Sequence, residues 1–219
     1  MEKTFCSMIF AAIIFMLVFS AGQVSAQDIR SDVSGFYTNL NLFYGKWSTS
    51  GQFLEGIRDY DPNGWGFQLS AGYGFNQRME AFAQFSQSDF NMSGDWNTYT
   101  HTELGAGFRY NFGATLSAVR PFLDVQINSS RMEIDRIFVD FPGFYSEGDL
   151  VMNGISMIAG AGTRYFIRPW LAASLHVRYH VGMEYDLELN GQTLNLDEEQ
   201  DLSQWDAGVG ITWYFGKRF

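Results

Sequence analysis

The chain is poor in cysteine, proline and lysine, and two of these shortages exclude whole classes of protein. Its 219 residues include one cysteine, Cys6, four prolines and three lysines. A single cysteine excludes a disulfide framework and a metal site built from several thiolates. The scarcity of lysine leaves a net charge of −10 and a pI of about 4.6, which exclude the basic surface that nucleic-acid binding requires. The longest apolar run, residues 8–19, is too short for a transmembrane helix, which needs about 20 residues.

The first 26 residues are typical of a cleavable signal peptide. Lys3 gives a short positive region, residues 8–19 form the apolar region, and Val24-Ser25-Ala26 is a small-x-small cleavage pattern. We therefore expect export, cleavage after Ala26, and a short periplasmic segment over residues 27–34. Cys6 precedes the apolar run, so it is not the lipidated cysteine of a lipoprotein.

Beyond residue 34 the chain alternates between apolar and polar residues, which is the period of a β-strand. The last stretch is the clearest example. One face carries Trp205, Ala207, Val209, Ile211, Trp213 and Phe215, and the other carries Asp206, Gly208, Gly210, Thr212 and Tyr214. Seven earlier stretches follow the same rule, with turn or loop signals between them, so the sequence predicts eight strands.

The apolar face of these strands could point into the core of a soluble, lipocalin-like barrel or outward into lipid. Glycines gather on the polar face, which suits a narrow interior, and aromatic residues gather at strand ends, as in the girdles of a membrane barrel. The polar face also carries five acids and five bases, which cancel as burial requires. They are Glu80, Glu103, Asp124, Glu184 and Asp206 with Arg109, Arg120, Arg164, Arg178 and Arg218, and His176 and His180 share their face. We therefore predict an all-β protein, an eight-stranded antiparallel up-and-down transmembrane β-barrel over residues 35–219.

The predicted connections alternate between long and short. Long outer loops are expected at about residues 46–63, 87–98, 129–150 and 186–203, with short periplasmic turns between the hairpins. The surplus negative charge lies on the outer loops, above all on the last one. Its acidic residues are Asp186, Glu188, Asp197, Glu198, Glu199 and Asp201. This acidic loop is either a solvated, self-repelling surface or a site for a divalent cation or a basic partner.

Three segments resemble the small outer-membrane β-barrel family that includes the OmpA transmembrane domain and OmpX. They are residues 120–123 (RPFL), 160–165 (GAGTRY) and 208–215 (GVGITWYF). The resemblance implies an integral protein of a Gram-negative-type outer membrane, in contact with outer-membrane lipids. It also implies that Trp213, Phe215 and the terminal Phe219 belong to the signal that the outer-membrane assembly machinery reads.

We expect no catalysis and no cofactor or metal. Small barrels include lipid A-modifying enzymes, and the deacylase type resembles His-x-Ser, but here His176 is followed by Val-Arg and His180 by Val-Gly. A grouping of Ser174, His176 and Glu184 is conceivable, although no motif supports it. Eight strands enclose an interior that side chains can fill, so a plugged lumen is expected, with a narrow gated pore as the alternative. The function expected is that of a monomer whose acidic outer loops meet an extracellular partner or support the envelope.

Overall fold

The computed structural model describes residues 31–50, 62–91, 99–141, 144–194 and 201–215, and in these ranges the chain forms nine strands. Their bounds are β1 Gly35–Ser50, β2 Asn63–Gly74, β3 Met79–Asn91, β4 Tyr99–Asn111, β5 Val119–Phe141, β6 Phe144–Arg168, β7 Leu171–Leu189, β8 Gln192–Leu194 and β9 Asp201–Tyr214. No helix within these ranges is long and apolar enough to cross a membrane.

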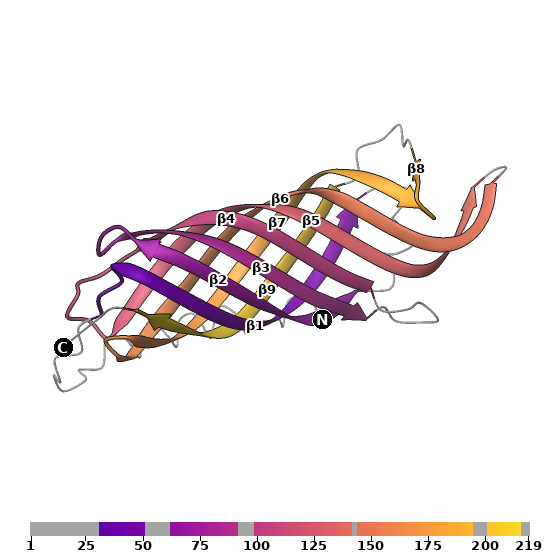
Figure 1. Cartoon of the computed structure of the whole chain (residues 1–219). Coiled ribbons are helices and arrows are strands. Elements are labelled where there is room, and N and C mark those ends of the chain that lie inside the picture. Colours follow the sequence, from indigo (N-terminus) through magenta and orange to yellow (C-terminus); the bar gives the residue numbers. More distant parts are fainter. Residues whose placement is uncertain (1–30, 51–61, 92–98, 142–143, 195–200, 216–219) are drawn as a thin grey trace.

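Eight of the strands close into one antiparallel barrel. Strands β1 to β7 each pair with the next along the chain, β7 pairs with β9, and β9 pairs with β1 to complete the ring. In the closing pair, Leu40 lies opposite Ile211. The short β8 pairs with the end of β7 outside the ring, where the longest strands project beyond the barrel (Figure 1). The predicted eight-stranded antiparallel barrel is confirmed.

Alternation along each strand sorts the side chains between the lumen and the outer surface. Val177 and Ile211 are 40% and 58% exposed, whereas Arg178, next to Val177, is 4% exposed. The other strands mostly follow the same rule, with aliphatic and aromatic side chains outside and polar or charged side chains inside, apart from buried apolar residues such as Phe82 and Met132. This polarity is the reverse of that in a soluble barrel, and it places the apolar face against lipid.

The strands run further than predicted at the end opposite the short turns. β5 reaches Phe141 and β6 begins at Phe144, so the loop expected at residues 129–150 is instead a long β-hairpin. Similarly, Asp186 and Glu188 of the predicted acidic loop lie in β7. Strand limits were predicted from alternation, but backbone pairing continues into water, where the outer face has no need to be apolar.

A band of mostly polar residues lies on the outer face of β3 to β7, beyond the apolar part of these strands. Two register rows cross β3 to β7 side by side: Gln87, Thr102, Arg131, Asn153 and Asp186 in one, and Asp89, Thr100, Glu133, Val151 and Glu188 in the next. We call these ten residues the outer collar. The adjacent row on the turn side contains exposed Leu104 and Ile155, so on these strands the outer face changes from apolar to mostly polar between that row and the collar.

Candidate functional site

One register row carries charges of alternating sign around the lumen wall. From β3 to β9 the residues opposite one another in succession are Glu80, Arg109, Asp124, Gly160, Arg178 and Asp206. We call the five charged residues of this row the ion ladder, and each of them is buried. Because barrel strands are tilted, the row climbs as a spiral from the turn end toward the outer end.

Direct ion pairs join the lower part of the ladder. Arg109 donates to Asp124 Oδ2 from Nη2 at 2.8 Å and from Nε at 3.1 Å, and its Nη1 lies 3.7 Å from Glu80 Oε2. Arg164 reaches Glu80 from the other side of the lumen and donates to both carboxylate oxygens, at 2.6 and 3.0 Å. Its Nη1 also donates to the Tyr214 hydroxyl at 2.7 Å. Glu80 is thus held by charge-assisted hydrogen bonds, the strongest kind, in a bidentate arrangement.

Gly160 makes room for the middle of the ladder. A Cβ at this position would lie 3.1 Å from Arg178 Cγ and 3.2 Å from Asp124 Cγ, with Asp124 Oδ1 closer still. Asp124 and Arg178 come from the two strands on either side of β6. The glycine therefore leaves space on the inner face of β6 for the side chains of Asp124 and Arg178, and any larger residue would occupy that space.

A histidine continues the network toward the outer end. His180 Nε2 lies 2.6 Å from Asp206 Oδ2, and His180 Nδ1 lies 3.4 Å from Glu103 Oε1. Glu103 also accepts hydrogen bonds from the hydroxyls of Ser86 at 3.1 Å and Ser156 at 3.0 Å. Both ring nitrogens of His180 thus face carboxylates, and the ring donates to both only when it is doubly protonated.

A serine–histidine contact in the lumen joins Ser130 and His101. The Ser130 hydroxyl lies 2.8 Å from His101 Nε2, and Glu103 Oε1 approaches the same nitrogen at 4.0 Å. In a catalytic triad the carboxylate must instead orient the ring from its opposite nitrogen. This contact is therefore part of the polar network of the lumen and does not have the geometry of a triad.

Ser174 and His176, the described members of the conceivable grouping with Glu184, share no hydrogen bond. Ser174 Oγ is buried and has no hydrogen-bond partner, and His176 Nε2 lies 3.6 Å from Asp206 Oδ1. The pairing of β6 with β7 shifts register around Glu184, whose side chain lies outside the described residues.

Apolar side chains fill the lumen at both ends of this network. The turn end contains one buried cluster, formed by Val33, Tyr37, Phe82, Phe166, Ala172 and Tyr214. We call it the lower cluster. At the outer end Tyr99 stacks on Phe90 with centroids 5.0 Å apart and meets Trp47 at 5.7 Å. Met132, Ile134, Leu150 and Met152 are buried on inward positions of neighbouring strands at this end. Sequence reasoning missed the outer group, because apolar residues there interrupt a nominally polar face.

Most of the charged residues predicted for the lumen lie inside the barrel. Those that are buried there are Glu80, Glu103, Arg109, Arg120, Asp124, Arg164, His176, Arg178, His180 and Asp206. Arg120 departs from the expected ion pairing, because it donates to the backbone carbonyls of Ser31, at 3.1 Å, and Gln77. The neighbouring segment, residues 31–34, carries no pattern that predicted this contact.

Several predicted residues lie outside the described residues or outside the lumen. Five of them lie outside the described residues: Arg218, Phe219, Asp197, Glu198 and Glu199. Trp213 and Phe215 of the predicted assembly signal are exposed on the outer face. Asp201 is the first residue of β9, opposite Ser50. Among the residues described, no three His, Cys, Asp or Glu side chains are arranged to hold a metal.

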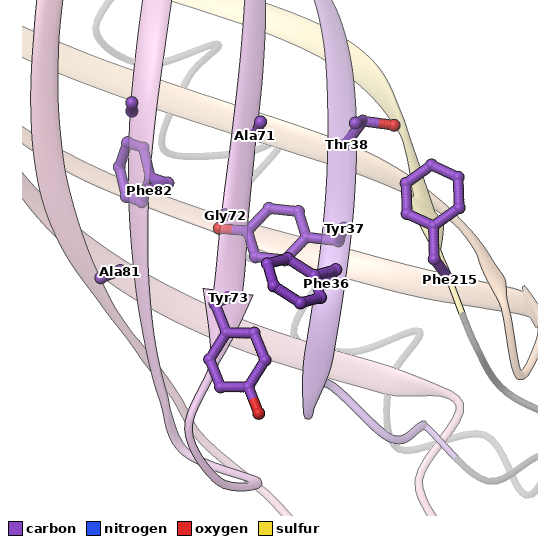
Figure 2. Close-up of a pocket in the computed structure, with 10 residues that line it drawn as sticks. Phe36, Tyr37, Thr38, Ala71, Gly72, Tyr73, Ala81, Phe82 and Phe215 are labelled. Carbon is purple, nitrogen blue, oxygen red and sulfur yellow. The ribbon is translucent and has the colours of Figure 1, made fainter.

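A shallow apolar groove lies on the lipid side of β1 to β3, near the turn end (Figure 2). Phe36, Tyr73 and Phe215 flank small residues such as Ala81 along this groove. Figure 2 also shows the Tyr37 ring passing behind Gly72, where a Cβ would lie 2.6 Å from Tyr37 Cζ. The groove opens onto acyl chains, so it is a lipid-contact surface on a thin part of the wall.

An apolar exterior around an ionic interior defines the class: this is a small transmembrane β-barrel. The chain belongs to the outer membrane protein beta-barrel domain family, whose model matches residues 12–215. This family places the protein in a Gram-negative-type outer membrane.

Similar solved structures share the fold at low sequence identity. Neisserial surface protein A is 18% identical over 83% of this chain and 98% of its own, with a TM-score of 0.61. OprG from Pseudomonas aeruginosa is 15% identical over 85% and 100%, with a TM-score of 0.52. The outer membrane protease OmpT from Escherichia coli is 8% identical over 89% and 99%, and its TM-score of 0.42 is too low to bear on activity. No curated protein sequence matches the chain.

Proposed function

We propose that this protein is a non-enzymatic, monomeric outer-membrane barrel with a plugged lumen, whose acidic outer surface mediates interaction or supports envelope integrity. The observation that carries the proposal is the set of contacts that cross the lumen. Arg164 on β6 grips Glu80 on β3, and His180 on β7 contacts Glu103 on β4. In each case the two strands are three apart in the ring, so the side chains bridge opposite walls.

These bridges oppose the passage of ions. A permeating ion would have to separate buried charges that face each other in a medium of low dielectric constant. Breaking such a pair costs about 3–5 kcal/mol when one partner is left uncompensated. The apolar groups at both ends of the lumen add a second obstacle, because they offer an ion no hydrogen bonds in place of its water shell.

Planar-bilayer recording of the purified barrel tests the plugged lumen. We expect a silent bilayer for the natural sequence. A Glu80→Ala/Arg164→Ala double variant serves as the positive control, because it removes the largest bridge and should give measurable current. Discrete conductance steps from the natural sequence would overturn the proposal in favour of a narrow gated pore.

The outer surface is the proposed interaction site. Asp89, Glu133, Asp186 and Glu188 belong to the outer collar. In the sequence, the acidic residues 197–199 lie between β8 and β9. Carboxylate oxygens suit divalent cations or the basic groups of an extracellular partner. Outer-membrane lipids and the assembly machinery that reads Trp213, Phe215 and Phe219 complete the proposed set of partners.

A loop variant tests the interaction site. Asp197→Asn/Glu198→Gln/Glu199→Gln removes three charges from the segment between β8 and β9 and should leave folding intact. Cells that produce it should bind less calcium or less of a cationic peptide, and should resist detergent less well, than cells that produce the natural sequence. Equal behaviour in all three assays would leave only a solvated loop surface.

The enzyme alternative has a direct test. The proposal predicts that lipid A mass spectra are the same with and without the gene, whereas a gene-dependent mass shift would indicate a lipid A-modifying enzyme.

We also propose that residues 1–26 are a signal peptide, that residues 27–34 begin the periplasmic side and that the barrel spans 35–219. Terminal sequencing of the membrane form should then begin at Gln27.

A further inference from the structure

Residues 31–34 cross the turn end of the barrel ahead of β1, and we call them the strap. The Ser31 amide donates to the Thr115 carbonyl at 2.8 Å, and the Ser31 hydroxyl donates to the same oxygen at 3.1 Å. Two residues on, the Val33 amide donates to Gln77 Oε1 at 3.4 Å. Gln77 lies in the β2–β3 turn and Thr115 in the β4–β5 turn. The strap is therefore tied to two turns that the sequence separates widely.

Val33 anchors the strap by packing into the lower cluster. Its side chain is fully buried in the lower cluster, whose other members line the inside of the barrel. Its carbonyl rests against Gly74, where a Cβ could not fit. Because removing an apolar side chain from water is favourable, the strap is held by an apolar contact as well as by hydrogen bonds.

Arg120 clamps the strap from inside. Its Nη1 donates to the Ser31 carbonyl at 3.1 Å and its Nη2 donates to the Gln77 carbonyl, so one guanidinium joins the strap to the β2–β3 turn. Arg120 is fully buried and lies opposite Arg164 in register. Because Arg164 is already paired with Glu80, the fork of donors on Arg120 turns to backbone carbonyls at the mouth.

We propose that the strap is the closure of the periplasmic mouth, and that this mouth is a built site for an extended peptide, occupied by the chain's own residues 31–34 and locked by Arg120. The proposal goes beyond the plugged lumen, which concerns the ion bridges and the apolar groups inside the barrel, whereas the strap lies across its mouth. It follows that displacing the strap exposes the lower cluster to the periplasm while the ion ladder stays in place.

The test exploits the absence of cysteine from the mature sequence. Ala172→Cys places a single thiol in the lower cluster, at a fully buried position. The purified barrel carrying this reporter, in phospholipid nanodiscs, is treated with a negatively charged methanethiosulfonate, and the rate of labelling is measured. On a denaturing gel, a difference in mobility between the unheated and the heated sample of a variant establishes that the variant is folded.

Three variants are compared in the reporter background. Replacing residues 31–34 by four glycines keeps the length but removes every side-chain contact, and Arg120→Met removes only the clamp. Both should label faster, by about tenfold or more, the factor expected when one or two buried hydrogen bonds are lost. Arg78→Met is the matched control, because Arg78 is an exposed arginine beside Gln77, and it should label at the parent rate.

Two results would overturn the strap as the closure. One is a folded glycine-strap variant that labels as slowly as the parent. The other, decisive if the glycine strap fails to fold, is a folded Arg120→Met variant with the parent rate. Neither result would contradict the plugged lumen, because that proposal is tested separately by the absence of conductance in a planar bilayer. Conductance through the natural sequence would instead contradict the plug and leave the labelling comparison valid.

Discussion

Arg164 and Arg120 lie opposite each other in register, are both fully buried, and donate hydrogen bonds from their Nη atoms to different kinds of partner. Arg164 is paired with the Glu80 carboxylate, whereas Arg120 donates to neutral carbonyls of the chain. Removing Arg164 would therefore leave a buried anion with less compensation, and removing Arg120 would leave only carbonyls to be hydrated. The two losses differ in kind, because an uncompensated buried charge is much more costly than an unpaired carbonyl.

Arg164→Ala should lower the free energy of unfolding by about 3–5 kcal/mol, because it breaks a buried pair and opens a cavity. The measurement is the urea midpoint of the barrel in lipid vesicles, followed by tryptophan fluorescence and by gel mobility. Arg131→Ala is the control: its pair with Glu133 has a similar distance, 2.6 Å, but both side chains are about half exposed. An exposed pair is worth about 0–1 kcal/mol. Equal midpoints for the two variants would contradict the role given to the Arg164–Glu80 pair.

At the scale of strands, the ion ladder depends on backbone as much as on charge. Antiparallel pairing brings one residue of each strand into the same row, and strand tilt turns that row into a spiral. β6 contributes Gly160 where its neighbours contribute Asp124 and Arg178. A side chain at that step would separate the two charged residues or push them off their rotamers.

Gly160→Val should destabilise the barrel by about 1–3 kcal/mol, the usual range for overpacking. Its matched control is Ala159→Val, on the same strand but on the exposed outer face, where lipid can move aside. Unfolding midpoints under the same urea protocol compare the two variants. If the control loses as much stability as Gly160→Val, the cost would come from the strand itself and not from the space that the ladder requires.

For the whole molecule, the sequence predicted what repeats along every strand and failed where the repetition stops. The number of strands, the outward apolar face and the inward position of residues such as Arg178 all follow from period two. The Arg120 contacts depend on three segments meeting at one end, which no local pattern records. The Glu80–Arg164 pair depends on the barrel's stagger, which brings β3 and β6 to the same height. The length of the β5–β6 hairpin was missed because its outer part lies in water, where pairing no longer requires alternation.

Because the apolar exterior defines the whole molecule, the cost of an added charge should depend on its height relative to the outer collar. Ile211→Arg puts a cation on the lipid face of β9, beside Leu40 and Ala173, and should cost about 2–4 kcal/mol near the middle of the bilayer. Asn153→Arg puts the same side chain in the outer collar, where water is at hand, and should cost about 0–1 kcal/mol. Reversible unfolding from lipid vesicles measures both.

The ratio of these two costs is the deciding result, since both variants introduce the same side chain and gain the same charge. In detergent micelles, which deform more easily than a bilayer, the penalty for Ile211→Arg should shrink while that for Asn153→Arg stays small. A soluble barrel would give a different pattern, because Ile211 would then be an interior position and its substitution would be as damaging in water as in lipid. Equal costs for the two variants in vesicles would mean that the collar does not mark the membrane edge.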